Sequence, residues 1–149
     1  MPYTDLQRAL GGLLAGEPDL IANCANFSAL VYTSLPDLNW AGVYLLRGEE
    51  LVLGPFQGRP ACVRIAMGRG VCGTAAARRV SLLVPDVHAF ADHIVCDPAS
   101  RSELVVPLLK DGALVGVFDM DSPLPARFSA ADQLGMEAAA ALLMAACRI

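Results

Sequence analysis

The sequence predicts an α+β domain in which a mainly antiparallel sheet carries helices on its faces. Helical periodicity occurs near both ends of the chain and in one short central segment, whereas extended segments come in adjacent pairs joined by short turns. This order lacks the strict alternation of strands and helices of a doubly wound fold. With 149 residues, 55% of them hydrophobic, the chain suits one domain, 1–149, with a full core.

Two helices are expected before the first strand. Thr4 and Gln7 have the spacing of a capping box, leucines then recur at helical intervals, and Gly16 ends the first helix. The second helix runs from about Asp19 to Ser34. Its apolar stripe includes Cys24, which we interpret as a small core residue.

Extended structure begins at Asn39. Aromatic and branched residues at 40–46 and 51–54 predict a hairpin across the turn Arg47-Gly48-Glu49, and Pro55, Gly58 and Pro60 mark a connection. The next expected elements are a short strand at 62–65, a helix that opens at Gly68-Arg69-Gly70 and runs to about Arg79, and a short strand at 81–84. Residues 85–101 have no clear periodicity, and such a long loop in a compact domain usually has a function.

Two longer strands, 103–109 and 113–121, complete the predicted sheet. Prolines at 123 and 125 end it, and Ser129 caps a last helix at 130–147 that is rich in alanine and leucine.

Composition excludes several classes of protein. Lys+Arg 11 against Asp+Glu 15 gives a net charge of −4, and the largest basic cluster is the pair Arg78-Arg79, so nucleic acid is a poor partner. The apolar runs fall short of the ~20 residues of a membrane span, and the first residues lack a secretion signal. Five cysteines without a Cys-x-x-Cys pair indicate free thiols in a reducing compartment, so we expect a cytoplasmic protein that binds no membrane.

Three cysteines in the middle of the chain are candidate reactive thiols: Cys62, Cys72 and Cys96. Cys96 lies in the long loop, where a thiol can meet solvent or substrate. The alternative is that all three are buried hydrophobic residues. A zinc site built from them with His88 and His93 is disfavoured, because the sequence lacks the short Cys-x2–4-Cys spacing of structural zinc sites.

Acidic residues form a second candidate group. Asp119 and Asp121 share one face of their strand, and Glu103 begins the partner strand. A two-residue turn would point Glu103 to the other face, whereas a three-residue turn with Gly112 left-handed would bring all three acids together. If they converge, they cannot all ionise, so at least one could donate a proton near pH 7. The alternative is a solvated strand end.

Trp40 and Tyr44 lie four residues apart on one predicted strand and therefore on the same face. They could wall a pocket for a small apolar group. Trp40 could instead be a simple core anchor.

Several of these residues belong to longer motifs. The motifs are Asn39-Trp40-x-Gly-x-Tyr44, Leu53-Gly-Pro-Phe-Gln-Gly58, Pro60-Ala-Cys62, Gly70-Val-Cys72-Gly-Thr-Ala, Val84-Pro-Asp-Val-His88, His93-Ile-x-Cys96-Asp, Ser100-Arg-Ser-Glu103 and Asp119-x-Asp121-Ser-Pro. Together they resemble the free methionine-(R)-sulfoxide reductases, which are single GAF domains. The resemblance spans nearly the whole chain and includes all three cysteines. One departure is Ala91-Asp92, where the family more often has Pro-Gly.

The resemblance implies a role for each matched residue. Cys96 matches the nucleophile that attacks the sulfoxide sulfur and becomes a sulfenic acid, Cys62 matches the thiol that resolves it to a disulfide, and Cys72 matches a third cysteine that relays or substitutes. The acids Glu103, Asp119 and Asp121 match those that hold the substrate ammonium and polarise or protonate the sulfoxide oxygen. Trp40 and Tyr44 match the wall around the terminal methyl group.

The same resemblance implies recycling by thioredoxin, no bound cofactor or metal, and a homodimer. It leaves two other functions open: a GAF module that binds a small regulatory ligand, and a thiol redox sensor. The turn at Gly68-Arg69-Gly70 offers backbone N–H groups at a helix start, where a substrate carboxylate could dock, although a tight turn that merely needs glycine explains the same residues.

Overall fold

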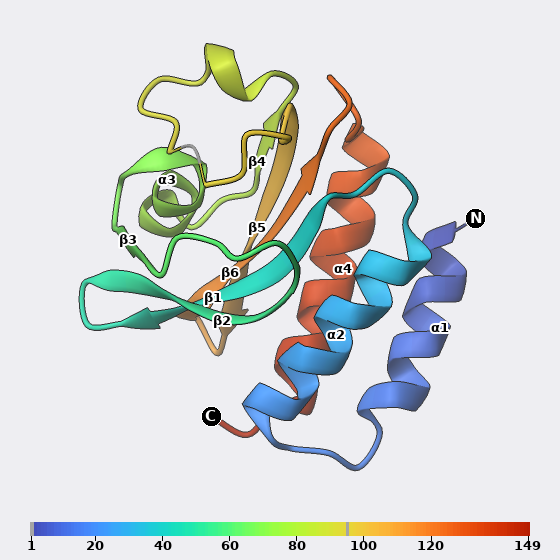
Figure 1. Cartoon of the computed structure of the whole chain (residues 1–149). Coiled ribbons are helices and arrows are strands. Elements are labelled where there is room, and N and C mark those ends of the chain that lie inside the picture. Colours follow the sequence, from blue (N-terminus) through green and yellow to red (C-terminus); the bar gives the residue numbers. More distant parts are fainter. Residues whose placement is uncertain (1, 95) are drawn as a thin grey trace.

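The computed structural model describes residues 2–94 and 96–149 and confirms the α+β class. Within these residues a six-stranded sheet has the order β3-β2-β1-β6-β5-β4, and all paired strands are antiparallel (Figure 1). The helices are α1 (Pro2–Leu14), α2 (Leu20–Ser34), α3 (Gly70–Arg78) and α4 (Ala130–Ala146), with a 3-10 turn at Val87–Ala89. The strands are β1 (Trp40–Arg47), β2 (Glu50–Gly58), β3 (Arg64–Ala66), β4 (Leu82–Val84), β5 (Ser102–Lys110) and β6 (Ala113–Ser122).

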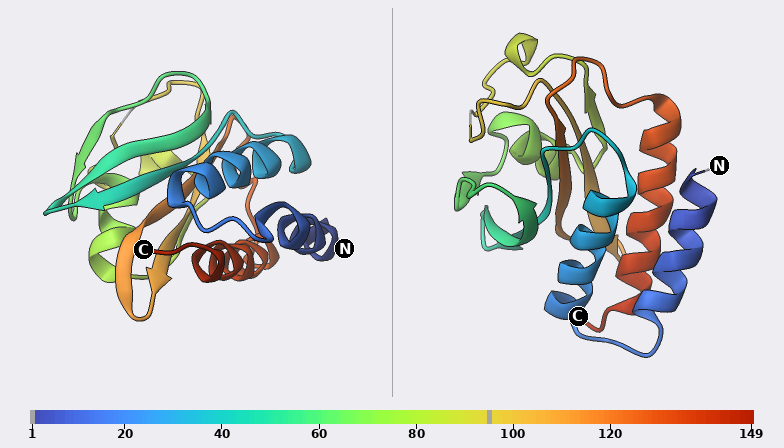
Figure 2. Two further views of the ribbon diagram at one scale, coloured as in Figure 1. Left: turned by 90° about the horizontal axis from the view of Figure 1, so that it is seen from below. Right: turned by 45° about the vertical axis from the view of Figure 1, so that its right-hand side comes forward.

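Helices cover both faces of the sheet, as predicted. α1, α2 and α4 lie together on one face, and α3 with the loop that follows β4 lies on the other (Figure 1, Figure 2). None of the helices in the described part of the chain combines the length and the apolar character that crossing a membrane requires.

Alternation along the strands creates two separate cores. Val43, Leu104 and Phe118 face α1, α2 and α4, while their neighbours Tyr44 and Val105 face α3. Because the second core is smaller and closes around only one short helix, its sheet face leaves room for a pocket.

The ends of several elements differ from prediction. Helix α1 begins at Pro2, so Thr4 lies inside the first turn and caps nothing; proline is well tolerated there because its missing N–H has no helical partner. β2 continues through Pro55 to Gly58, and β3 begins at Arg64, so Cys62 lies in the connection between them.

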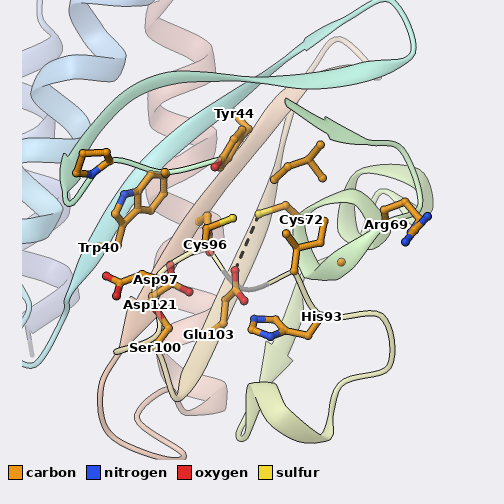
Figure 3. A pocket seen from close by; sticks show the side chains of 16 residues that line it. Trp40, Tyr44, Arg69, Cys72, His93, Cys96, Asp97, Ser100, Glu103 and Asp121 are labelled. Carbon is orange, nitrogen blue, oxygen red and sulfur yellow. Dashed lines mark hydrogen bonds between the residues drawn. The ribbon is translucent and has the colours of Figure 1, made fainter. Parts of the chain in front are cut away.

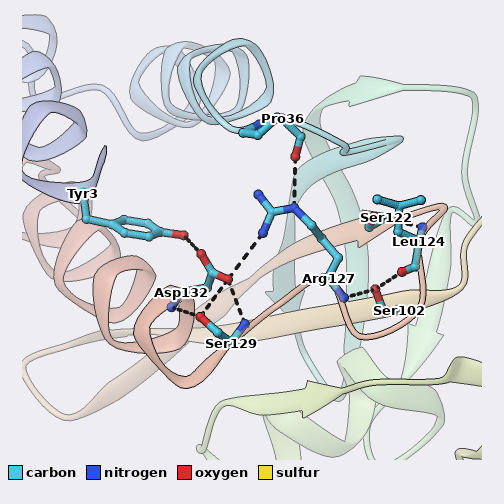
Figure 4. A network of polar contacts seen from close by, with 8 residues as sticks. All are labelled: Tyr3, Pro36, Ser102, Ser122, Leu124, Arg127, Ser129 and Asp132. Carbon is cyan, nitrogen blue, oxygen red and sulfur yellow. Dashed lines mark hydrogen bonds and ion pairs between the residues drawn. The ribbon is translucent and has the colours of Figure 1, made fainter. Parts of the chain in front are cut away.

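A partly buried polar network joins the chain ends on the helical face (Figure 4). The Tyr3 hydroxyl donates to Asp132 Oδ1 at 2.7 Å, and Asp132 forms a capping box with Ser129 at the start of α4, as the sequence predicts for Ser129. Burial alone would raise the pKa of Asp132, but hydrogen bonds from Tyr3 and Ser129 and the nearby Arg127 charge hold it below its usual value. This network fixes α1 against α4.

Candidate active site

One pocket on the α3 side of the sheet collects most of the predicted site residues (Figure 3). The predicted residues among its lining are Trp40, Tyr44, Cys72, Cys96, Glu103, Asp119 and Asp121. They come from β1, α3, the loop before β5, and the paired strands β5 and β6. Residues far apart in the sequence thus converge on one cavity.

Cys62 joins the same site through a disulfide to Cys96. The two cysteines are 34 residues apart in the chain, and their Cα atoms are 5.6 Å apart. Cys72 remains a free, buried thiol, and its Sγ donates to Glu103 Oε2 at 4.0 Å. All three central sulfur atoms therefore lie at or beside the pocket.

The three acids share one face of the sheet, for a reason that the sequence did not reveal. The turn is the two-residue one, since Lys110 pairs with Ala113, yet the prediction that such a turn points Glu103 away is wrong. A bulge between Leu108 and Leu109 shifts the pairing by one residue, so Glu103 lies opposite Asp121 and diagonal to Asp119.

This arrangement raises the pKa of all three acids. For Glu103 and Asp121, burial is the main cause and the charge of Asp119 adds to it, which places their pKa values well above the usual range. Burial also raises the pKa of Asp119, although hydrogen bonds from Glu103 and Cys72 oppose it. The cluster can therefore hold protons at neutral pH.

Asp119 also presents an unused acceptor. Its Oδ1 is buried and has no hydrogen-bond partner among the described residues, although the side chain is only 6% exposed. A buried carboxylate oxygen without a donor is costly, so a ligand that brings a donor, such as an ammonium group, would be stabilised there.

The pKa of the Cys72 thiol lies well above its usual value, because the side chain is buried and the charges of Asp119 and Glu103 disfavour a thiolate. Cys72 is therefore a protonated thiol at neutral pH in this state. That makes it a poor first nucleophile.

An aromatic wall closes one side of the pocket. Trp40 stacks on Tyr44, with ring centroids 5.9 Å apart, and on Phe56 at 5.3 Å. The Trp40 indole donates to the Arg59 carbonyl at 3.1 Å, and the Tyr44 hydroxyl donates to the Cys62 carbonyl at 2.8 Å. Both aromatic residues thus fix the segment that carries Cys62.

Sequence reasoning missed the residues that hold the Cys96 loop. Asn39 Nδ2 donates to Asp97 Oδ2 at 3.1 Å and to Ser100 Oγ at 3.0 Å, while the backbone N–H of Asn39 donates to the backbone carbonyl of Asp121 at 2.9 Å. The position of Asn39 directly before a strand indicated a polar residue at the edge of the sheet, but it did not indicate which distant residues it would bind.

The zinc set considered from the sequence is not brought together as thiolates, because Cys62 and Cys96 are bonded to each other. Among the described residues, donor atoms of Cys72, Glu103 and Asp119 lie within 4.8 Å of one another and could surround a cation.

Comparisons with known proteins extend over most of the chain. The GAF domain family matches residues 19–147. The free methionine-R-sulfoxide reductase of Escherichia coli is 53% identical over 134 residues, which cover 90% of this chain and 81% of that protein.

Two solved structures are similar throughout. A putative GAF sensor protein from Burkholderia vietnamiensis has 58% identity and a TM-score of 0.95, covering 98% of this chain and 93% of that one. The free methionine-R-sulfoxide reductase of Staphylococcus aureus, in complex with substrate, has 44% identity and a TM-score of 0.94, covering 98% of this chain and 95% of that one.

Proposed function

This chain belongs to the free methionine-R-sulfoxide reductases, a family of GAF-domain enzymes, and we propose that it reduces free L-methionine-(R)-sulfoxide to methionine with Cys96 as nucleophile. One observation carries this proposal: the Cys62–Cys96 disulfide borders a pocket that contains three converging acids with raised pKa values. A thiol and a proton donor at one cavity are the two groups that sulfoxide reduction needs.

In the first step, the Cys96 thiolate attacks the sulfur of the sulfoxide while an acid donates a proton to its oxygen. The oxygen then passes to Cys96 Sγ: the bond just formed between the two sulfur atoms and the sulfur–oxygen bond of the substrate break, which leaves Cys96 as a sulfenic acid and the substrate as methionine. A neutral sulfoxide is a poor electrophile until its oxygen is protonated or strongly hydrogen-bonded. Glu103, Asp119 and Asp121 are the candidate donors, and their raised pKa values suit the task.

In the second step, the Cys62 thiol attacks the sulfenic acid, water leaves, and the disulfide forms. An external dithiol of the thioredoxin type then reduces the disulfide, with Cys72 available as a relay thiol. The chain uses thiols in place of a bound cofactor.

Substrate recognition follows the polarity of the pocket. We assign the terminal methyl group of the substrate to the wall formed by Trp40 and Tyr44, and its ammonium to the acid cluster, where Asp119 Oδ1 lacks a donor. We further propose that the protein acts as a homodimer and that it works in a reducing compartment such as the cytoplasm.

The test is turnover with each free methionine sulfoxide epimer, thioredoxin, thioredoxin reductase and NADPH. We expect NADPH oxidation with the R epimer and one methionine formed per NADPH. Tight ligand binding without turnover would indicate a regulatory GAF module, and disulfide formation by peroxide without methionine formation would indicate a redox sensor. Either outcome would refute the proposal.

A further inference from the structure

An arginine that lines the pocket is already paired with a carboxylate from outside the pocket lining. Arg69 directly precedes α3 and lines the pocket, and Asp92 lies in the loop that carries Cys96. Arg69 Nε donates to Asp92 Oδ2 at 2.6 Å, and Arg69 Nη2 donates to Asp92 Oδ1 at 3.0 Å. This two-pronged geometry is the one in which a guanidinium binds any carboxylate.

The charges around the pocket are strongly polarised. Four of the described lining residues are acids, namely Asp97, Glu103, Asp119 and Asp121, and Arg69 is the only permanently cationic one among them. Burial and the charge of His88 lower the pKa of His93, so its imidazole is neutral at pH 7. In Figure 3, Arg69 lies across the labelled residues from Trp40.

A free amino acid carries an ammonium and a carboxylate on the same carbon, so it needs both signs of charge from its site. The acid cluster supplies the negative side and would repel a carboxylate. Arg69 can supply the positive side, but only if Asp92 releases it.

We propose that Arg69 is the receptor for the α-carboxylate of the substrate, and that Asp92 is an internal stand-in which the substrate displaces. The inference rests on the proposed function, because it takes the ligand to be a free amino acid. It predicts selectivity against methionine sulfoxide within a peptide, which has an amide in place of that carboxylate.

Asp92 is suited to leave. Its backbone has φ +66°, in the left-handed region, which aspartate adopts more readily than most side chains but less readily than glycine. The side chains of Arg69 and Asp92 are 62% and 48% exposed, and an ion pair so open to water is weak. Release of Asp92 would also free the Cys96 loop from its ionic link to the start of α3.

The test measures binding of methionine-(R)-sulfoxide by calorimetry to the reduced Cys96→Ser protein, which lacks the nucleophile. Arg69→Ala should weaken binding by about tenfold or more, and Arg69→Lys should recover part of the loss. Asp92→Asn keeps the shape and tolerates a left-handed backbone but lacks the charge, so it should tighten binding by about two- to fivefold. Arg64→Ala breaks the comparable exposed pair with Glu50, 2.6 Å long and outside the pocket lining, and should change nothing.

A second ligand shows whether Arg69 binds the substrate carboxylate or only holds the loop in place through Asp92. Methionine sulfoxide amide lacks the carboxylate, so it should bind the Cys96→Ser protein weakly and with equal affinity after Arg69→Ala. Unchanged sulfoxide affinity in Arg69→Ala, or equal weakening by Asp92→Asn and Arg69→Ala, would overturn the inference while turnover by the wild type stands. A wild type that neither binds nor reduces the sulfoxide would overturn the proposed function as well.

Discussion

Glu103 lies directly opposite Asp121 on the paired strands β5 and β6, and the pairing depends on one bulge between Leu108 and Leu109. The bulge brings the three acids together in one buried cluster, in which burial is the main cause of the raised pKa values. Glu103 is a buried candidate to donate a proton, and burial and its acidic neighbours raise its pKa well above the usual value.

Glu103→Gln should slow the chemical step by about 10²- to 10⁴-fold, because the amide cannot serve as a general acid. Single-turnover kinetics measure this directly. In the wild type, the rate of this step should fall as pH rises through the raised pKa of the acid, and the variant should lack that limb. A variant that loses substrate affinity but keeps its chemical rate would reassign Glu103 to the ammonium.

The acid cluster should make the protein less stable as pH rises. A carboxyl group whose folded pKa is raised keeps its proton after the unfolded chain has lost it, so the free energy of unfolding falls from about pH 4 upward through the folded pKa. Glu103→Gln should therefore raise the melting temperature at pH 8 by about 3 °C for each kcal/mol of strain relieved. Thermal melts of both proteins across pH 4–9 measure the effect, and the gap should close at the acid end.

Asp132 provides the opposite control, because its pKa is lowered in the folded state. Its contribution is present above the unfolded pKa and is lost as pH falls through the folded value. Asp132→Asn should destabilise at pH 7, and its effect should fade as pH falls through the lowered pKa of the folded state. Equal pH profiles for Glu103→Gln and Asp132→Asn would contradict both assignments.

Cysteine variants should divide the reaction into its steps. Cys96→Ser should abolish methionine formation, since a hydroxyl is a far weaker nucleophile than a thiolate. Cys62→Ser should still release one methionine per chain and then stop as a sulfenic acid, which dimedone labelling and mass spectrometry detect. Appreciable turnover by Cys96→Ser would exclude Cys96 as nucleophile.

Tyr44→Phe should affect the second step more than the first. The variant keeps the aromatic wall but loses the 2.8 Å bond to the Cys62 carbonyl, so Cys62 is held less firmly. We expect disulfide formation to slow by about fivefold, as for one net hydrogen bond, while methionine release in a single turnover is unchanged. Rapid quenching with thiol alkylation reports the two rates; slowing of methionine release alone would contradict this role.

Two glycines should respond oppositely to alanine. A Cβ at Gly135 in α4 would overlap the ring of Tyr3, so Gly135→Ala should cost about 1–3 kcal/mol of stability. A Cβ at Gly12 in α1 meets nothing within 4 Å, so Gly12→Ala should stabilise by about 0.5–1 kcal/mol. Chemical denaturation measures both values, and a stabilised Gly135→Ala would show that α1 and α4 can move apart.

The sequence predicted the class and the two hairpins, β1–β2 and β5–β6, because hydrophobic period and turn residues are local signals. It could not predict where Glu103 points, since a bulge depends on how β5 and β6 settle against the rest of the sheet. Thr4 was misread for a similar reason: its spacing to Gln7 suits a cap, but the helix continues to Pro2.

The sequence predicted which kinds of residue form the site better than it predicted which residues contact one another. Thiols, acids and aromatic residues were visible in the motifs, whereas the pairing of Arg69 with Asp92 and the bonds from Asn39 join segments tens of residues apart. No local pattern encodes such contacts. Asp92 adopts a backbone conformation that glycine adopts more readily, which agrees with the glycine that the family more often has at this position.

The covalent link between Cys62 and Cys96 gives the enzyme two mechanical states. A disulfide between residues 34 positions apart lowers the conformational entropy of the unfolded chain, which stabilises the folded state by roughly 3–4 kcal/mol. Each catalytic cycle would make and cut that restraint, so the molecule awaiting its reductant would resist unfolding and proteolysis better than the one awaiting substrate. Scarcity of reductant would thereby lengthen the lifetime of the idle enzyme.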